Sequence, residues 1–188
     1  MANDFDVDAI ADVMATFLSG SISKMQKNLD DSKSNNSGAL RQSIGENLSK
    51  GVIVDGESVS MTISLDDYYA FVDEGVQGAG GTSKYVSGKT FTNQNTTSSF
   101  KYTNKMPPFK DIFNWVTTKT NKIVGFSDTF RTLLIQESIF GKGTKPTNFF
   151  SDVINEKTLD KFIAQLFEAS AESVELNIGN IVKTANKK

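Results

Sequence analysis

The chain has 188 residues and a net charge of −2, and it contains neither cysteine nor histidine. Its hydrophobic content of 38% and charged content of 22% are typical of one globular domain with its own core. The two missing residue types exclude disulfides, thiol nucleophiles, the common zinc sites and imidazole catalysis. The composition therefore favours a structural protein, for which we expect no cofactor and no enzymatic activity.

Charge is distributed unevenly along the chain. Residues 1–75 contain 13 acidic and 5 basic residues, a net charge of −8, whereas residues 76–188 contain 9 acidic and 15 basic residues, a net charge of +6. Oppositely charged halves favour head-to-tail stacking of copies, because complementary fields steer encounter and set register. Solvated surface on both halves explains the pattern equally well.

The first third of the chain predicts two helices and a hairpin. Apolar residues at steps of three and four indicate an amphipathic helix from Asp8 to about Asp30. Ser37 is placed to cap a short helix over residues 38–45. Alternating apolar residues then predict strands over residues 46–54 and 58–65, which Asp55-Gly56 joins as an antiparallel hairpin.

The middle of the chain is less regular. Asp66 or Asp67 is expected to cap a helical segment that ends at Gly75. Residues 76–105 are rich in Gly, Ser, Thr and Asn, and a loop of this length is uncommon in a compact domain unless it is functional. We therefore expect an inserted loop or β-hairpin arm that reaches a neighbouring subunit.

The remaining residues predict three helices. One follows Pro107-Pro108 and runs to about Thr120, one runs from a Ser127 cap to Gly141, and the last spans Leu159 to Ile178. The predicted class is α+β, a single domain over residues 1–188. Its small antiparallel sheet is packed by a long N-terminal helix and several C-terminal helices, with a long inserted arm.

Targeting segments are not evident in the sequence. No apolar run approaches the length of a membrane-spanning helix. The N-terminal residues are acidic and lack the basic-then-apolar order of a secretory signal. We expect a protein that is made in the cytoplasm and used there or packed into a particle, without a membrane partner.

Two glycine-rich stretches and one acidic group were tested as enzymatic motifs. Residues 78–81 lack the strand-to-helix context of a phosphate loop, and residues 141–144 have the wrong spacing because Pro146 stands where a glycine should be. The acidic residues near the predicted strands could ligate the metals of a nuclease. Turn and cap roles explain them better, so a nuclease is a minor alternative; these residues are Asp55, Glu57, Asp66, Asp67, Asp73 and Glu74.

Lysines and aromatic residues alternate between Lys84 and Lys122, where seven lysines accompany one acid, Asp111. Such a stretch can follow phosphates and stack on bases. The chain has only two arginines and a net charge of −2, which argues against a dedicated nucleic-acid binder. A solvated charged hairpin is the simpler explanation, and transient contact with DNA in a channel is the alternative, through Lys84, Lys89, Lys101 and Lys105.

Three short phrases carry a resemblance to a known family. They are SGALRQSI at residues 37–44, YAFVDEG at residues 69–75 and GKGTKPTNFF at residues 141–150. In order and spacing they resemble the neck and tail-completion (minor head-to-tail joining) proteins of tailed bacteriophages, over roughly residues 8–175. That family typically has T/S-G-x-L-x-x-S-I, Y-A-x-V-E-x-G-T and G-x-x-P-x-P-F. This chain differs at Asp73 in the Glu position, Val76 in the Thr position and Asn148 in a Pro position.

The resemblance implies a virion structural protein at the head-to-tail joint, assembled in the host cytoplasm. Its partners would be copies of itself in a ring, the adjoining portal or adaptor and tail proteins, and transiently the packaged DNA. A tail terminator or tail-tube-associated subunit is the alternative within the virion, and a small intracellular binding module is a further one. The candidate interface residues are Tyr85, Phe91, Phe100 and Tyr102, together with Phe149 and Phe150, for which a core position is the alternative.

Overall fold

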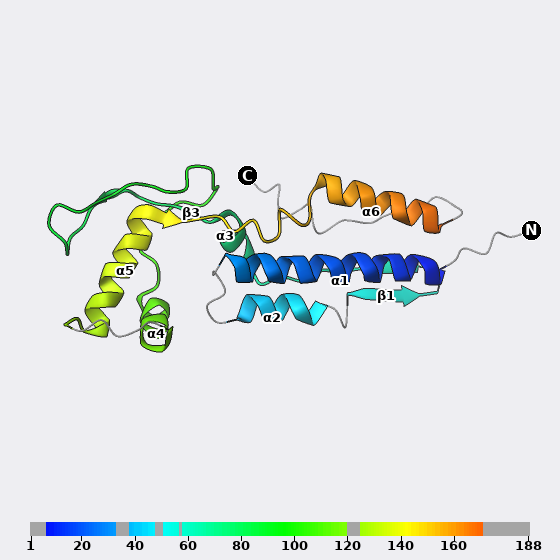
Figure 1. The fold of residues 1–188 in the computed structure, drawn as a ribbon, viewed down its shortest axis with the longest axis horizontal. Helices are drawn as coiled ribbons and strands as arrows, with labels where there is room; N and C mark the ends of the chain where they lie inside the picture. The colour runs from blue at the N-terminus through cyan, green and yellow to red at the C-terminus, as the bar shows by residue number, and fades with distance from the viewer. Residues whose placement is uncertain (1–6, 33–37, 48–50, 57, 120–124, 171–188) are drawn as a thin grey trace, which may run out of the picture.

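The computed structural model describes residues 7–32, 38–47, 51–56, 58–119 and 125–170. The molecule is elongated, and its elements form two groups along the long axis, with α3 (Tyr69–Glu74) between them (Figure 1). One group contains α4 (Phe109–Lys119), α5 (Asp128–Lys142) and the segment 76–105. The other contains α1 (Val7–Asp31), α2 (Ala39–Glu46), the strands β1 (Val52–Asp55) and β2 (Ser58–Met61), and α6 (Glu156–Ala169).

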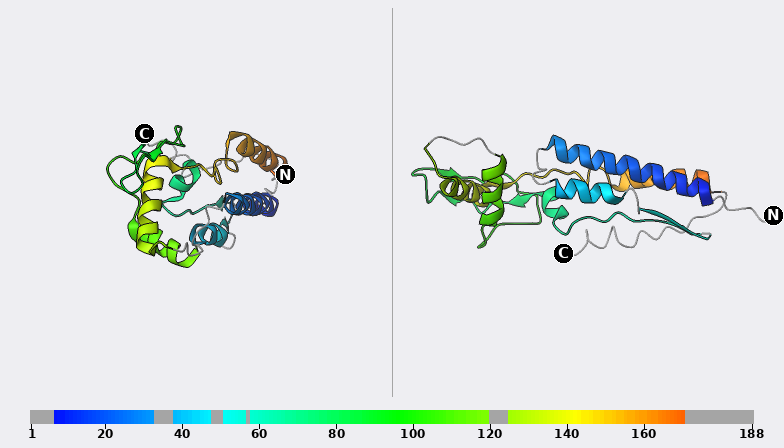
Figure 2. Two further views of the ribbon diagram at one scale, coloured as in Figure 1. Left: turned by 60° about the vertical axis from the view of Figure 1, so that its left-hand side comes forward. Right: turned by 90° about the horizontal axis from the view of Figure 1, so that it is seen from below.

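The long N-terminal helix α1 confirms the prediction from apolar periodicity and organises its end of the molecule. It packs against α2, α6 and the β1–β2 hairpin, which lie around it (Figure 2). Its buried stripe belongs to two core clusters: the first half contacts Phe162 and Leu166 of α6, and the second half contacts Leu40 and Ile44 of α2. The buried apolar residues of α1 are Ile10, Met14, Leu18, Ile22, Met25 and Leu29.

The predicted hairpin is confirmed, with shorter strands than expected. β1 pairs antiparallel with β2 around the Asp55-Gly56 turn, where Gly56 has a φ of 59°. Residues 46 and 47 end α2 and do not begin a strand. The Asn47 side chain explains why no strand begins here. Its amide donates to the Ser64 carbonyl and its Oδ1 accepts from the Ser64 N–H.

Helix ends differ from the predictions at three places. Gly38, with a φ of 78°, occupies the N-cap of α2, and Ser37 lies outside the described residues. Tyr68 stands at the N-cap of α3 without a side-chain cap, so Asp66 and Asp67 do not have that role. α6 ends at Ala169 because Ser170 is extended, and residues 171–178 of the predicted helix lie outside the described residues.

Two helix starts are as predicted. α4 begins directly after Pro108, and the Ser127 side chain caps α5 by accepting from the Phe130 N–H. α6 begins at Glu156, before the predicted Leu159, because a capping box in which Asn155 and Thr158 satisfy each other's backbone N–H groups starts it there. These caps fix the starts of the helices that the apolar pattern alone located only approximately.

The α+β class is confirmed, although the strands of the described residues form three separate two-stranded antiparallel sheets. Besides the hairpin, β3 (Val76–Gln77) pairs with β6 (Gly143–Thr144), and β4 (Gly81–Thr82) pairs with β5 (Thr90–Phe91). The inserted residues therefore pair with each other and with the end of α5, and not with the hairpin. None of the helices formed by the described residues has both the length and the apolar content that crossing a membrane requires.

Candidate functional site

The three phrases that carry the resemblance meet at one place. Leu40 and Ile44 of the first phrase and Phe149 of the third lie in the same buried cluster on α1. Tyr69 and Val72 of the second phrase pack against that cluster. We refer to residues 38–44, 69–75 and 143–151 together as the junction. It lies where α3 and the chain leading to α6 connect the two groups of elements (Figure 1).

A buried carboxylate connects two parts of the junction. Asp73 is only 6% exposed, and its Oδ1 accepts from the N–H groups of Phe150 at 2.8 Å and Ser151 at 3.2 Å. The Thr147 hydroxyl donates to the Val72 carbonyl at 2.8 Å. The Asp73 carboxylate, at the acidic position of the second phrase, therefore binds the backbone of the third phrase and of Ser151 directly after it.

Asn148 explains one departure from the family phrase. Its φ is 50°, a left-handed conformation in which Asn is tolerated far better than most residues. Proline cannot adopt it, because its ring fixes φ near about −65°. The Asn148 N–H also donates to the Asp73 carbonyl at 3.0 Å, a bond that proline could not form. The local turn therefore requires a residue other than proline here.

The inserted segment 76–105 does not extend away from the molecule as an isolated arm. The Gln77 N–H donates to the Phe100 carbonyl, and the Tyr102 N–H donates to the Gln77 carbonyl. Phe91 is 6% exposed and lies where a side chain at Gly141 of α5 would have to be. The segment thus packs on α5 through Phe91, which is buried within the same subunit.

Two polar residues attach the insertion to the junction. Asn95 Nδ2 donates to the carbonyls of Glu74 and Thr144, at 2.8 and 3.1 Å. The buried Ser98 hydroxyl donates to the Gly75 carbonyl at 2.7 Å. Sequence reasoning missed both residues, because Asn and Ser in a polar stretch indicate only a loop and do not identify its distant partners.

The other predicted interface residues differ in exposure. The Phe100 ring lies 4.1 Å from the Phe71 ring, centroid to centroid, and the Tyr102 ring lies 5.9 Å from the Phe140 ring. Burial of Tyr102 raises the pKa of its phenol above the ordinary value. Phe100 and Tyr102 are therefore half-buried within the subunit, and Tyr85, at 42% exposed, remains a surface residue.

The sequence left two alternatives for Phe149 and Phe150, a subunit interface or the core. The structure places both of them in or against the core. Phe149 is fully buried, and Phe150 is half-buried with its ring 5.4 Å from that of Tyr69. Phe91 and Phe149 therefore stabilise the subunit itself. As it is folded here, neither presents its ring to another copy.

Glu137 holds the tip of the insertion against α5. Its buried carboxylate accepts from the Ser83 hydroxyl and from the Lys84 N–H, each at 2.5 Å. Ser83 in turn accepts from the N–H groups of Tyr85 and Val86 at its Oγ. This chain of bonds fixes a turn that exposes Tyr85 and Val86 at the surface.

Changing Glu137 to alanine is expected to release this turn. Loss of two charge-assisted hydrogen bonds removes about 2–4 kcal/mol of local stability. Amide hydrogen exchange at Lys84, Tyr85 and Val86 should then accelerate, while exchange in α1 stays unchanged. Glu137→Gln, which keeps one acceptor oxygen, should give a smaller acceleration. Equal exchange at these three amides in Glu137→Ala and in the unchanged protein would contradict the assignment.

An exposed aromatic cluster lies beside this turn, formed by Tyr85, Val86, Phe126 and Phe130. The Phe126 and Phe130 rings stack at 5.5 Å between centroids, and Tyr85 meets Phe130 edge-on at 6.2 Å. Phe126 is 52% exposed and Tyr85 42% exposed. Of these residues, sequence reasoning named only Tyr85 as an interface candidate. Phe126 precedes the Ser127 cap, a position that gives no apolar periodicity.

The four candidate DNA-contacting lysines Lys84, Lys89, Lys101 and Lys105 are all exposed. None of them forms an ion pair with another described residue. The Nζ of Lys89 lies 5.4 Å from the centroid of the Phe91 ring. These lysines leave the end of the molecule around α4 and α5 basic, and contact with DNA stays a prediction.

The acidic residues considered for a nuclease are spread over several roles. Asp73 binds backbone N–H groups, and Glu74 accepts from the N–H and hydroxyl of Ser99. Glu57 lies outside the described residues, which contain no group of three acidic side chains placed to hold a metal ion.

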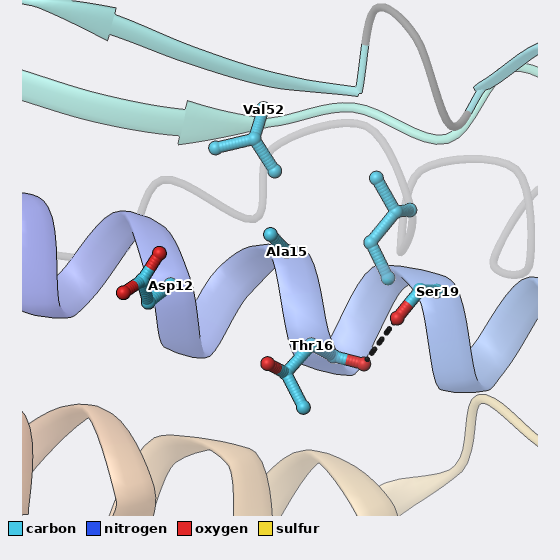
Figure 3. Close-up of a pocket in the computed structure, with 6 residues that line it drawn as sticks. Asp12, Ala15, Thr16, Ser19 and Val52 are labelled. Carbon is cyan, nitrogen blue, oxygen red and sulfur yellow. Dashed lines mark hydrogen bonds between the residues drawn. The ribbon is translucent and has the colours of Figure 1, made fainter.

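A groove along α1 is lined by few side chains that could take part in acid–base catalysis. Its lining contains one titratable side chain, Asp12, and the Ser19 hydroxyl is already bonded to the Thr16 carbonyl at 3.0 Å (Figure 3). An acid–base pair requires a second titratable group within reach. The residues lining the groove are Asp12, Ala15, Thr16, Leu18, Ser19 and Val52.

Comparison with known proteins finds no family model, no curated relative and no solved structure that matches this chain.

Proposed function

We propose that this chain is a virion structural protein of a tailed phage, a subunit of a connector, neck or tail-completion ring at the head-to-tail joint. The observation that carries the proposal is the junction. The phrases that resemble the family are separated by up to a hundred residues in the chain, yet they meet in one buried cluster and one set of hydrogen bonds.

The junction gives several positions of the phrases a physical reason. Leu40 and Ile44 anchor α2, Phe149 lies in the same buried cluster, and Asp73, which replaces the family's Glu, binds the backbone ahead of α6. Gly75 has a φ of 68° and lies against Thr144, where a larger residue would collide with backbone. Chance matches spread over unrelated surfaces would not be expected to converge in this way.

The charge pattern supports contacts between copies. The described residues 76–119 and 125–144 form the end around α4 and α5 and contain eight basic and three acidic residues, a net charge of +5. Among the first 75 residues, the described ones contain three basic and ten acidic residues, a net charge of −7, and most of them lie in the opposite end. An elongated subunit with opposite charges at its two ends favours heterologous contacts, which close into rings when the rotation between copies allows it.

The aromatic cluster supplies the apolar part of such a contact. Aromatic residues are enriched at the centre of protein interfaces, where a few of them contribute most of the binding energy. Tyr85 and Phe126 are both exposed aromatic residues, at 42% and 52%. In this proposal the acidic end of the next copy covers them.

The test is the mass of the purified protein over a range of concentrations, measured by light scattering after size exclusion. We expect assemblies larger than one chain at low ionic strength, and partial dissociation as salt screens the charges. Phe126→Ser should lower the association constant at least about tenfold, the effect of losing a contact of at least about 1.4 kcal/mol, and so lower the assembled fraction.

Tyr68→Ser is the matched control, because Tyr68 is similarly exposed, at 42%, but stands at the N-cap of α3, between the two ends of the molecule. It should leave the assembled fraction unchanged. A strictly monomeric protein at all concentrations, or equal effects of the two substitutions, would contradict the proposed interface.

A further inference from the structure

Two stretches of chain connect the two groups of elements, and they run side by side. The first, residues 74–77, continues from α3, and the second, residues 143–146, leads toward α6 (Figure 1). They pair as β3 and β6, with Val76 opposite Thr144. The helices pack chiefly within their own group, α4 against α5, and α1 against α2 and α6. The angle between the two groups therefore depends on these two stretches.

Each stretch contains a glycine in a conformation that other residues rarely adopt. Gly75 has a φ of 68° and a ψ of −167°, and Gly143 has a φ of 80° and a ψ of −173°. This region of backbone conformation is essentially restricted to glycine. Hinges between parts of a protein consist of a few residues in loops or at the ends of elements that can take up changes in φ and ψ. Two such glycines on adjacent stretches therefore provide a hinge, unless another contact holds it closed.

One side chain of the insertion joins the two stretches at this place. Asn95 is 3% exposed, and its Nδ2 donates to the Glu74 carbonyl on the first stretch and to the Thr144 carbonyl on the second. The Nδ2 atom also fills the space beside Gly75, where a Cβ would lie 2.7 Å from it. Because both carbonyls accept from the same amide group, the two stretches cannot separate or turn without breaking a buried hydrogen bond.

The other side of the Asn95 amide shapes the loop that carries it. Its Oδ1 accepts from the N–H groups of Thr97 at 3.2 Å and of Ser98 at 3.1 Å. The Ser98 hydroxyl in turn donates to the carbonyl of Gly75, the glycine of the first stretch. The oxygen of the Asn95 amide therefore forms the loop, and its nitrogen binds the loop to the two stretches.

We propose that residues 93–99 of the insertion act as a clamp, in which the Asn95 amide holds the two groups of elements at a fixed angle. The insertion then has a role within its own subunit, where it closes a hinge that the two glycines would otherwise leave free to turn. This inference does not depend on the ring proposal, because it concerns contacts within one copy. In a ring whose copies meet at opposite ends of the subunit, the same angle would set the curvature of the ring.

The test is the distance between the two groups in the full chain, measured between two spin labels by double electron–electron resonance. The chain contains no cysteine, so Lys24→Cys on α1 and Asn114→Cys on α4, both at exposed positions, supply the only attachment sites. An excess of unlabelled chain removes the contribution of distances between copies. With Asn95 in place, the labels should give one narrow distance distribution.

Asn95→Asp should replace this narrow distribution with a broad one. The carboxylate keeps an acceptor oxygen for Thr97 and Ser98 but cannot donate to the two carbonyls. The amides of Thr97 and Ser98 should stay protected from hydrogen exchange, which shows that the loop has remained folded. Gln94→Glu is the matched control, because it makes the same amide-to-carboxylate change at the exposed neighbouring residue and should leave the distribution narrow.

Four outcomes would overturn the proposal. A broad distribution with Asn95 in place would show that the two groups are not held, and a narrow one in Asn95→Asp would show that the pairing of β3 with β6 is sufficient. Equal broadening in Gln94→Glu would assign the effect to the added charge. Rapid exchange at Thr97 and Ser98 in Asn95→Asp would contradict the separate roles of the amide oxygen and nitrogen.

Discussion

Replacing Phe149 with alanine is expected to lower the free energy of unfolding by about 3–5 kcal/mol, the usual range for a fully buried phenylalanine. Phe149 is completely inaccessible to solvent and lies between α1 and α2, in contact with the cluster that contains Leu40 and Ile44. Truncation removes apolar burial and leaves a cavity at the point where the phrases meet. Thermal unfolding should occur roughly 6–20 °C lower.

Phe167→Ala provides the comparison, because the same atoms are removed from a side chain that is 53% exposed. Its effect should stay within about 0.5 kcal/mol, as for most surface substitutions. Similar losses in the two variants would show that Phe149 does not anchor the core of the junction.

Replacing Asp73 with alanine is the second change with a large expected effect, about 3 kcal/mol of unfolding free energy. The substitution leaves the N–H groups of Phe150 and Ser151 without their acceptor in a partly buried place. Asp73→Asn keeps an acceptor oxygen of the same size and should cost about 1 kcal/mol. Chemical denaturation measured for both variants gives the comparison.

Asp67→Ala is the control for Asp73, since Asp67 is a nearby carboxylate that is exposed. It should change the unfolding free energy by less than about 0.5 kcal/mol. If the loss in Asp73→Ala were no larger than in Asp67→Ala, the carboxylate would not connect α3 to the chain before α6.

Elements with a strong local pattern could be predicted from the sequence. The apolar stripe of α1, the Asp55-Gly56 turn and the Ser127 cap each depend on neighbours within a few residues, and each is found in the structure. The end of α6 was placed too late, at Ile178. Apolar residues continue past Ala169, and their spacing alone does not reveal the extended backbone at Ser170.

Features that depend on distant partners could not be predicted in the same way. The sequence places Asp73 only among the possible metal ligands, because nothing near it in sequence indicates that Phe150 and Ser151 will bring their N–H groups to it. Phe91 was assigned to an intersubunit contact, but the small size of Gly141, fifty residues away, leaves room for its ring inside the subunit.

The central claim is that this protein acts through docking surfaces and assembles at the head-to-tail joint. Native mass spectrometry of the purified chain, alone and mixed with portal and tail proteins of the same phage, tests it most directly. The account predicts a closed homo-oligomer, and a larger complex when those proteins are added. A chain that stays monomeric alone and in every mixture would contradict it.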